Sequence, residues 1–476
     1  MLYKSYQQIR ADLDEQIITV AQIVNYHLEK IEEHNPNLNA FIEVFKEEAI
    51  LKAVQVDLKL KQGTAGRLAG LVVGIKDLFC LKDHLVSCSS RILEDFESQI
   101  TATPIQRLLD EDAIVIGRQN CDEFAMGSSN ENSAFGLVKN GVNPSRVPGG
   151  SSGGSAVGVQ TDMCQISLGS DTGGSVRQPA AFCGVFGLKP TYSRISRYGL
   201  TAYSSSFDCV GILSKSIADT ELILEIIAGS DERDTTSSRK KVPQFSRSPI
   251  KSSSYKIAYF NEINEVEGIA TSVSQMMNQT MSSLKTSGHL LEKVSFPFLE
   301  YLLPTYYILT SAEASANLAR FDGARYGFRG LEISNLESMY KKSRTQGFGS
   351  EVLRRILLGT FVLSSGYQDA FYTKAQKVRR LVKDYTEKIL EEYDFIISPT
   401  TATTAFEINS KTIDPVEMYL SDLFTVQASV AGIPAISIPL GEDQNAMPIG
   451  LQVMTASFEE EKLFSFAKSF TITSFR

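Results

Sequence analysis

Histidine is scarce in this sequence of 476 residues, which contains only four: His27, His34, His84 and His289. An α/β-hydrolase places its serine in a Gly-x-Ser-x-Gly turn behind an apolar strand, and its histidine follows later in the chain. Residues 149–153 match that turn, but Arg146-Val147-Pro148 stands where the strand is needed, and only His289 follows, in a polar segment. The sequence therefore disfavours such a Ser-His-Asp enzyme. His84 would be the base only in another chain order.

Cysteine shows no metal-binding or disulfide pattern. The six cysteines are scattered without Cys-x-x-Cys spacing, at positions 80, 88, 121, 164, 183 and 209. In a chain of this length we interpret them as buried thiols of a reducing compartment. We therefore expect no zinc and no other metal site.

A basic excess and long apolar runs are also missing. The net charge of −8 argues against a chain that binds nucleic acid by itself, because phosphate binding needs a basic surface. The charge does not exclude a partner subunit that carries the nucleic acid. No run of about 18 uncharged apolar residues occurs, and the polar N-terminal segment lacks the apolar stretch of a signal peptide. We expect a cytoplasmic protein without a membrane span.

The pattern that is present alternates strands with helices. Thr19, with Gln22 three residues later, predicts the start of an amphipathic helix on which His27 packs. Further helices are predicted over 48–61, 104–109, 217–227 and 459–468, with a mainly helical span at 302–390. Strands are predicted over 41–45, 71–75, 113–117, 255–260, 395–397, 435–440 and 449–454. This alternation predicts an α/β protein.

Other segments break the regular pattern. Residues 230–254 are rich in serine, proline and charge, which predicts an exposed loop or linker. Residues 184–190 and 193–200 are interrupted by Gly, Pro and Arg, so we expect irregular backbone close to the functional site. Residues 121–136 are predicted to form a polar loop.

Glycine and serine concentrate in residues 148–179, in two Gly-Gly-Ser turns at 149–151 and 173–175. Glycine lets the backbone turn sharply and lets a substrate approach its N–H groups. We expect the two turns to face one another and form one site. A phosphate-binding P-loop is disfavoured, because it needs a lysine directly after its last glycine, whereas Ser155 follows Gly154.

A serine nucleophile with a lysine base fits the remaining residues. Lys76 closes the apolar run 71–75, and burial there would lower the pKa of its amine toward neutrality. Taken alone, such a lysine more often extends to the surface. Composition leaves both Ser151 and Ser152 open as a proton relay, and Ser175 would equally suit a helix cap. Backbone N–H groups of the second turn would stabilise an oxyanion.

The two turns resemble the amidase signature family, whose hallmark is Gly-Gly-Ser-Ser-Gly-Gly followed by Gly-(Ser/Thr)-Asp-x-Gly-Gly-Ser. The resemblance implies a Ser–cis-Ser–Lys triad, in which Ser175 is the acyl-ester nucleophile, Ser151 the cis-serine proton relay and Lys76 the base. The spacings agree with the family: Ser175 follows Ser151 by 24 positions, and Ser151 follows Lys76 by 75. The oxyanion hole would be formed by the backbone amides of Thr172, Gly173, Gly174 and Ser175.

The same resemblance implies a fold. The fold is a large mixed, twisted β-sheet covered by helices on both faces, in one domain over 1–476 with its core signature at about 68–215. The helical span 302–390 would be an insertion. Supporting hydrogen bonds are expected from Asp77, Asp171 and Arg177.

Motifs beyond the turns resemble one branch of this family, the glutaminase subunits of tRNA-dependent amidotransferases. They lie at 122–133, 146–150, 187–192, 304–307, 317–323 and 354–359. The branch implies that glutamine is hydrolysed to glutamate and that ammonia passes to a partner that converts Glu-tRNA(Gln) to Gln-tRNA(Gln). It also implies no cofactor in this chain, ATP and Mg used by a heterotrimer with two further subunits, B and C, and tRNA held mainly by the B subunit.

The branch also implies that Tyr306, Arg355 and Asp422 hold the two charged ends of free glutamine. A guanidinium suits the carboxylate and an anion suits the ammonium group. Arg354 is adjacent, and the sequence leaves open which of the two arginines binds. Two other functions stay open: a stand-alone amidase of small or aryl amides, and a catalytically inactive scaffold subunit. The complete Lys-Ser-Ser set argues against the scaffold.

Overall fold

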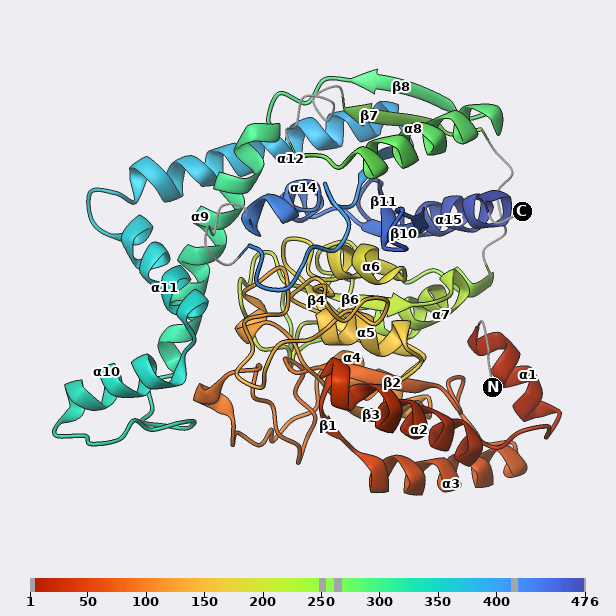
Figure 1. The fold of residues 1–476 in the computed structure, drawn as a ribbon, viewed down its shortest axis with the longest axis horizontal. Coiled ribbons are helices and arrows are strands. Elements are labelled where there is room, and N and C mark those ends of the chain that lie inside the picture. The colour runs from red at the N-terminus through yellow and green to blue at the C-terminus, as the bar shows by residue number, and fades with distance from the viewer. Residues whose placement is uncertain (1–4, 248–253, 261–267, 412–417, 475–476) are drawn as a thin grey trace.

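One mixed sheet of eleven strands runs through the computed structural model, which describes residues 5–247, 254–260, 268–411 and 418–474 (Figure 1). The strand order is β1-β3-β2-β4-β6-β5-β10-β11-β9-β7-β8. The strands are β1 (Phe41–Val44), β2 (Val72–Lys76), β3 (Ile114–Gln119), β4 (Ile166–Asp171), β5 (Phe186–Lys189), β6 (Cys209–Ser214), β7 (Lys256–Phe260), β8 (Leu290–Val294), β9 (Phe395–Pro399), β10 (Ala435–Glu442) and β11 (Pro448–Met454).

Strand direction changes along the sheet. β2 pairs in parallel with β3 and β4, and β7 pairs in parallel with β8 and β9. The strands between these two groups, from β4 to β9, pair in antiparallel fashion. The central strands β2, β3, β4 and β6 are buried along their whole length, which explains their apolar composition.

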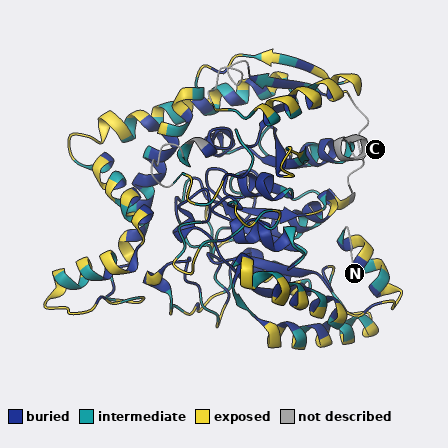
Figure 2. Cartoon of the chain, in the orientation of Figure 1, coloured by how far each residue is buried: buried dark blue, intermediate teal, exposed yellow. Residues whose placement is uncertain are grey.

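Helices cover both faces of this sheet (Figure 1). They are α1 (Tyr6–Asp14), α2 (Val20–Leu38), α3 (Lys46–Gln62), α4 (Thr103–Asp110), α5 (Gly153–Gln160), α6 (Arg177–Cys183), α7 (Ile217–Ile227), α8 (Thr271–Thr286), α9 (Leu299–Asn317), α10 (Leu336–Gly347), α11 (Ser350–Leu363), α12 (Lys374–Glu392), α14 (Val426–Ala431) and α15 (Glu460–Ser474). Helices α9 to α12 form an arm at one side of the sheet, and their outer faces are exposed (Figure 2).

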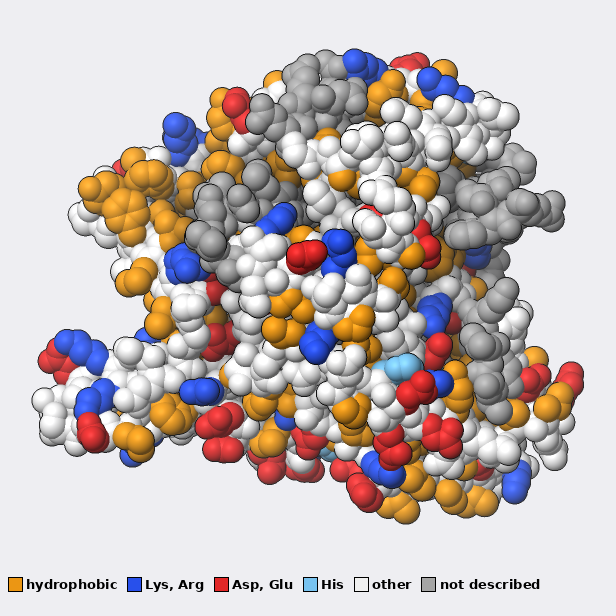
Figure 3. All heavy atoms as spheres, viewed as in Figure 1, with side chains coloured by type: hydrophobic (Ala, Val, Ile, Leu, Met, Phe, Trp, Pro, Cys, Tyr) orange, Lys and Arg blue, Asp and Glu red, His pale blue; other side chains and the backbone are white. Residues whose placement is uncertain are grey.

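Short 3₁₀ and π turns complete the described elements: η1 (Arg91–Leu93), η2 (Glu123–Ala125), η3 (Phe245–Arg247), η5 (Leu318–Arg320), η6 (Asp369–Thr373) and η7 (Leu420–Asp422). Among the described residues, no helix has the length and apolar composition needed to cross a membrane. Apolar side chains gather on the helical arm where α11 leads to α12 (Figure 3); Leu357, Phe361 and Tyr367 of this part are exposed.

Most elements with a clear hydrophobic period lie where the sequence predicts them. The Thr19–Gln22 capping box opens α2, as expected. One prediction is wrong: residues 184–190 are not irregular throughout, because β5 lies within them. It is held by ladders to β6 and β10, so long-range pairing overrides its glycine and lysine. Several further elements were not predicted: α1, α5, α8, α14, β4, β6 and β8.

The segment 230–254 is a loop that partly docks on the molecule. Phe245 is fully buried, and its ring lies 5.5 Å from that of Phe464 on α15. Asp231 accepts hydrogen bonds from the hydroxyls of Thr103 and Ser196. Residues 248–253 of this segment lie outside the described residues.

Candidate active site

Lys76 ends β2, and its amine lies among three serine hydroxyls. Nζ is 2.7 Å from Oγ of Ser151, 2.9 Å from Oγ of Ser152 and 3.0 Å from Oγ of Ser170. The side chain is fully buried, and burial lowers the pKa of Lys76 to about 8. About a tenth of the amine is then neutral at pH 7, which allows Lys76 to accept a proton.

The two Gly-Gly-Ser turns lie side by side, as the sequence predicts. The backbone N–H of Ser152 donates to the carbonyl of Ser175 at 3.1 Å. Gln178, which follows the second turn, accepts a hydrogen bond from the N–H of Gly150 at 2.9 Å. The peptide bond between Gly150 and Ser151 is cis. The structure thus brings Lys76, Ser151 and the turn that carries Ser175 into one place.

The second turn offers unused hydrogen-bond donors. In the part of the chain that the structure describes, the N–H groups of Gly173, Gly174 and Ser175 have no intramolecular acceptor. Just beyond the turn, Arg177 bonds to Asp171 through Nη2 at 2.8 Å and through Nε at 3.0 Å. Although burial alone would raise it, the Arg177 guanidinium keeps the pKa of Asp171 below its usual value. A rigid turn with free N–H groups is suited to stabilise an oxyanion.

Arg355 of α11 points into the protein, whereas the neighbouring Arg354 does not. The side chain of Arg355 is 4% exposed and that of Arg354 is 50% exposed. Arg355 bonds to Glu351 at 2.8 Å and to the hydroxyl of Tyr203 at 2.7 Å. Its guanidinium also lies over the rings of Tyr203, Tyr307 and Tyr419. Of the two arginines, only Arg355 is placed to face a buried ligand.

Asp422, in η7, is a buried carboxylate near this guanidinium. It accepts hydrogen bonds from the hydroxyls of Ser128 at 2.8 Å and Tyr307 at 2.9 Å. Burial raises the pKa of Asp422 to about 6, although these two bonds and the charge of Arg355 act in the opposite direction. The structure therefore provides an anion with spare acceptor capacity and a cation within one region.

Tyr306 of α9 connects that region with the turn at 173–175. Its side chain is buried, and a Cβ added at Gly173 would lie only 2.5 Å from the Tyr306 hydroxyl oxygen. Glycine at 173 is therefore required for this close approach. Tyr306 also packs edge-on against Tyr307 with ring centroids 5.0 Å apart.

Several contacting residues were missed by sequence reasoning. Ser170 on Lys76, Tyr203 on Arg355, and Ser128 and Tyr307 on Asp422 lie far from their partners in the chain. One signal was available: Ser170 and Asp171 are polar residues at the end of a strand buried throughout. Ser152, which composition left open beside Ser151 as a proton relay, also contacts the Lys76 amine directly.

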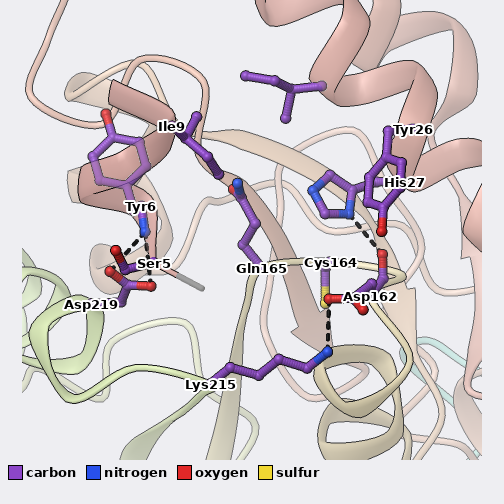
Figure 4. A pocket seen from close by; sticks show the side chains of 11 residues that line it. Ser5, Tyr6, Ile9, Tyr26, His27, Asp162, Cys164, Gln165, Lys215 and Asp219 are labelled. Carbon is purple, nitrogen blue, oxygen red and sulfur yellow. Dashed lines mark hydrogen bonds and ion pairs between the residues drawn. The ribbon is translucent and has the colours of Figure 1, made fainter. Parts of the chain in front are cut away.

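Among the described residues, none of the four histidines bonds to this cluster, and His34 lies beside Glu33 on α2. His27 lines a small cavity between α1 and α2, together with Tyr6, Asp162 and Asp219 (Figure 4). Its Nδ1 bonds to the carbonyl of Asp162 at 2.7 Å, and burial lowers the pKa of His27 to about 4, so the ring is neutral. His84 bonds instead to Glu48, and His289 accepts from the N–H of Tyr255.

A cavity of about 350 Å³ opens beside Glu351, the partner of Arg355. It is lined by residues 131–134 and 346–351, together with Arg91 and the buried Glu123. No group of three or more His, Cys, Asp or Glu side chains within the described ranges is arranged to hold a metal ion.

Comparisons with known proteins identify relatives over nearly the whole chain. The profile of the amidase family matches residues 22–464. The A subunit of glutamyl-tRNA(Gln) amidotransferase from Chlorobium limicola is 48% identical over 471 residues, which cover 98% of this chain and 99% of that protein. The crystal structure of the A subunit of the Thermotoga maritima glutamyl-tRNA(Gln) amidotransferase is 38% identical, with a TM-score of 0.79 over 96% of this chain and 92% of that one. Peptide amidase from Stenotrophomonas maltophilia is 25% identical, with a TM-score of 0.82 over 98% and 96% of the two chains.

Proposed function

The chain belongs to the amidase family, and from this premise we propose that it is the glutaminase component of a tRNA-dependent amidotransferase. It hydrolyses glutamine to glutamate and supplies ammonia for the conversion of Glu-tRNA(Gln) to Gln-tRNA(Gln). The observation that carries the proposal is the buried Lys76 amine bonded to Ser151, in a chain nearly half identical to such proteins along its whole length.

The proposed reaction begins with attack of the Ser175 hydroxyl on the side-chain carbonyl carbon of glutamine. The hydroxyl proton passes to Ser151, and the proton of Ser151 passes to neutral Lys76. N–H groups of residues 172–175 donate to the negatively charged oxygen. Lys76 returns the proton through Ser151 to the leaving nitrogen, and ammonia departs. Water then attacks the Ser175 ester and releases glutamate.

We assign the two charged ends of glutamine to Arg355 and Asp422. The Arg355 guanidinium binds the α-carboxylate, the Asp422 carboxylate binds the α-ammonium, and Tyr306 packs between them and the oxyanion turn. The burial of both charged side chains supports this assignment, because opposite charges attract more strongly in the low-dielectric interior than in water.

We further propose that the chain works in the cytoplasm as one member of a heterotrimer with the B and C subunits. The assembled complex uses ATP and Mg, and the tRNA is held mainly by the B subunit; the acidic balance of this chain fits that division. The relatives are named as one lettered component of an amidotransferase, which supports the existence of partner chains.

The triad is tested with Ser175→Ala in the assembled complex. Glutamine hydrolysis should fall to background, while amidation with added ammonia continues at the normal rate. The exposed Ser145→Ala is the matched control and should change neither rate. Loss of both activities in Ser175→Ala would contradict the division between the two reactions.

The glutamine pocket is tested with a pair of neighbouring arginines. Arg355→Lys should raise the KM for glutamine about tenfold or more, because lysine cannot replace the planar guanidinium. Arg354→Lys, on the exposed face of the same helix, should leave KM within about twofold. An unchanged KM in Arg355→Lys would favour the alternative, a stand-alone amidase of small amides.

A further inference from the structure

Thr425 joins the segment that carries Asp422 to the turn that carries the oxyanion donors. Its hydroxyl Oγ1 lies 2.7 Å from the carbonyl oxygen of Gly173 and 3.0 Å from that of Asp422. Its backbone N–H donates to the same Asp422 carbonyl at 3.0 Å. The side chain is fully buried, so no water competes for these bonds.

The hydroxyl of Thr425 is not used as a helix cap. Thr425 precedes α14, where a threonine side chain normally accepts a bond from the first turn. No such cap bond is formed here. The hydroxyl has one proton, and its shorter contact is with Gly173. The Thr425 hydroxyl therefore forms no capping bond and instead contacts Gly173, which lies 252 positions earlier in the chain.

The contact fixes the orientation of a donor in the turn. The C=O of Gly173 and the N–H of Gly174 belong to one planar trans peptide unit, so they point in opposite directions. Holding the carbonyl at Thr425 directs the N–H of Gly174 away from it, and that N–H has no intramolecular acceptor among the described residues. A Cβ on Gly174 would overlap Thr425, and the φ of +145° there also requires glycine.

The carboxylate of Asp422 is held separately from its carbonyl. Ser128 and Tyr307 donate to the carboxylate, while the backbone N–H of Thr425 donates to the carbonyl of the same residue. Arg177 in turn donates to the carbonyl of Thr425 at 2.7 Å and also to Asp171 at the start of the turn. Hydrogen bonds through Thr425 thus connect the backbone of Asp422 with the Gly173–Gly174 peptide.

We propose that Thr425 is a positioning residue that aligns the Gly174 N–H of the oxyanion hole and couples this alignment to occupation of Asp422. The proposal rests on the proposed glutaminase function, since Asp422 is taken to bind the α-ammonium of glutamine. Thr425 itself touches neither the substrate nor the reacting atoms.

The test uses Thr425→Val, which keeps the branched shape but removes the hydroxyl, and Thr425→Ser, which keeps the hydroxyl. In the complex with its partner subunits, Thr425→Val should lower kcat for glutamine by about tenfold to a hundredfold, less than deletion of an oxyanion donor costs. The KM of Thr425→Val for glutamine should stay within about threefold of that of the natural chain, because Arg355 and the Asp422 carboxylate are unchanged. Thr425→Ser should retain kcat within about threefold. Thr425→Ala, which is smaller, provides the same test should valine not fold.

Coupling is measured with glutaramate, the analogue of glutamine without its α-amino group. For the natural chain, kcat should be lower for glutaramate than for glutamine; in Thr425→Val the two values should converge. Equal kcat in Thr425→Val and the natural chain, or equal losses in the Val and Ser variants, would overturn the proposal. If the natural chain hydrolyses other amides but not glutamine, the proposed function is wrong. The kcat values of Thr425→Val and Thr425→Ser on those amides would then still test whether Thr425 aligns the Gly174 N–H.

Discussion

At the scale of single residues, burial determines whether Lys76 can accept a proton. Because its amine has a pKa of about 8, the neutral fraction rises about tenfold with each pH unit up to that value. We predict that kcat/KM for glutamine rises with this slope from pH 6.5 to about 8 and is constant above it. The rate of Ser175 acylation by an irreversible probe should follow the same curve. A flat profile below pH 8 would show that another group accepts the proton.

Asp422 should control glutamine binding at lower pH. Its pKa is raised by burial to about 6, so below pH 6 the carboxyl is protonated and loses the charge that attracts an ammonium group. We predict that the KM for glutamine rises about tenfold per pH unit below 6. For Asp422→Asn, KM should be high and independent of pH in this range. Glutaramate, which lacks the amino group, is the substrate control, and a parallel rise of its KM would contradict this role.

At the scale of elements, the distance between α9 and α11 sets the geometry of the proposed glutamine pocket. α9 provides Tyr306, and α11 provides Arg355. Gly359 allows the two helices to touch, because a Cβ there would overlap the carbonyl oxygen of Ser311. Backbone cannot move aside as a flexible side chain can, so the overlap separates the helices.

Gly359→Ala should therefore destabilise the protein despite the higher helix propensity of alanine. Overpacking costs about 1–3 kcal/mol, whereas the propensity gain is at most about 1 kcal/mol. We predict a lower midpoint of urea unfolding together with a higher KM for glutamine. Leu357→Ala, on the same helix at a side chain that is 71% exposed, should change neither value measurably. Equal effects of the two variants would rule out this account.

At the scale of the whole molecule, a buried ion pair attaches the last helix to the loop after β5. Glu460, the first residue of α15, bonds to Arg194 at 3.0 Å and accepts from the N–H and hydroxyl of Thr191. Both charged side chains are almost completely buried. Removing one partner leaves the other charge buried without compensation.

We predict that Glu460→Ala lowers the free energy of unfolding by about 3–5 kcal/mol. Urea unfolding followed by circular dichroism measures the change. The matched control is Glu459→Ala, the preceding exposed residue, which should shift the midpoint little. If the two variants unfold at the same urea concentration, the ion pair does not stabilise the attachment of α15.

The sequence by itself determined the elements with a clear period and the parts of the site carried by short motifs. Local patterns encode α2, α7 and the buried strand that ends at Lys76, because their periodicity reports a buried face. The Gly-Gly-Ser turns indicated where the site lies in the sequence. Glycine is needed there because backbone segments approach closely, and serine provides hydroxyls that contact Lys76. The scarcity of histidine, with four in the chain, disfavoured a histidine base.

Only the tertiary structure decided which distant side chains meet. It placed Arg355 rather than Arg354 inside, because the direction of a side chain depends on how its helix packs. It brought Ser170 to Lys76, and Thr425 to the turn at Gly173, across strand pairings and chain separations that no local pattern specifies. It also made a strand of β5, since ladder bonds form between residues distant in sequence. Local sequence sets the backbone of each segment, but the geometry of the site is set where those segments pack against one another.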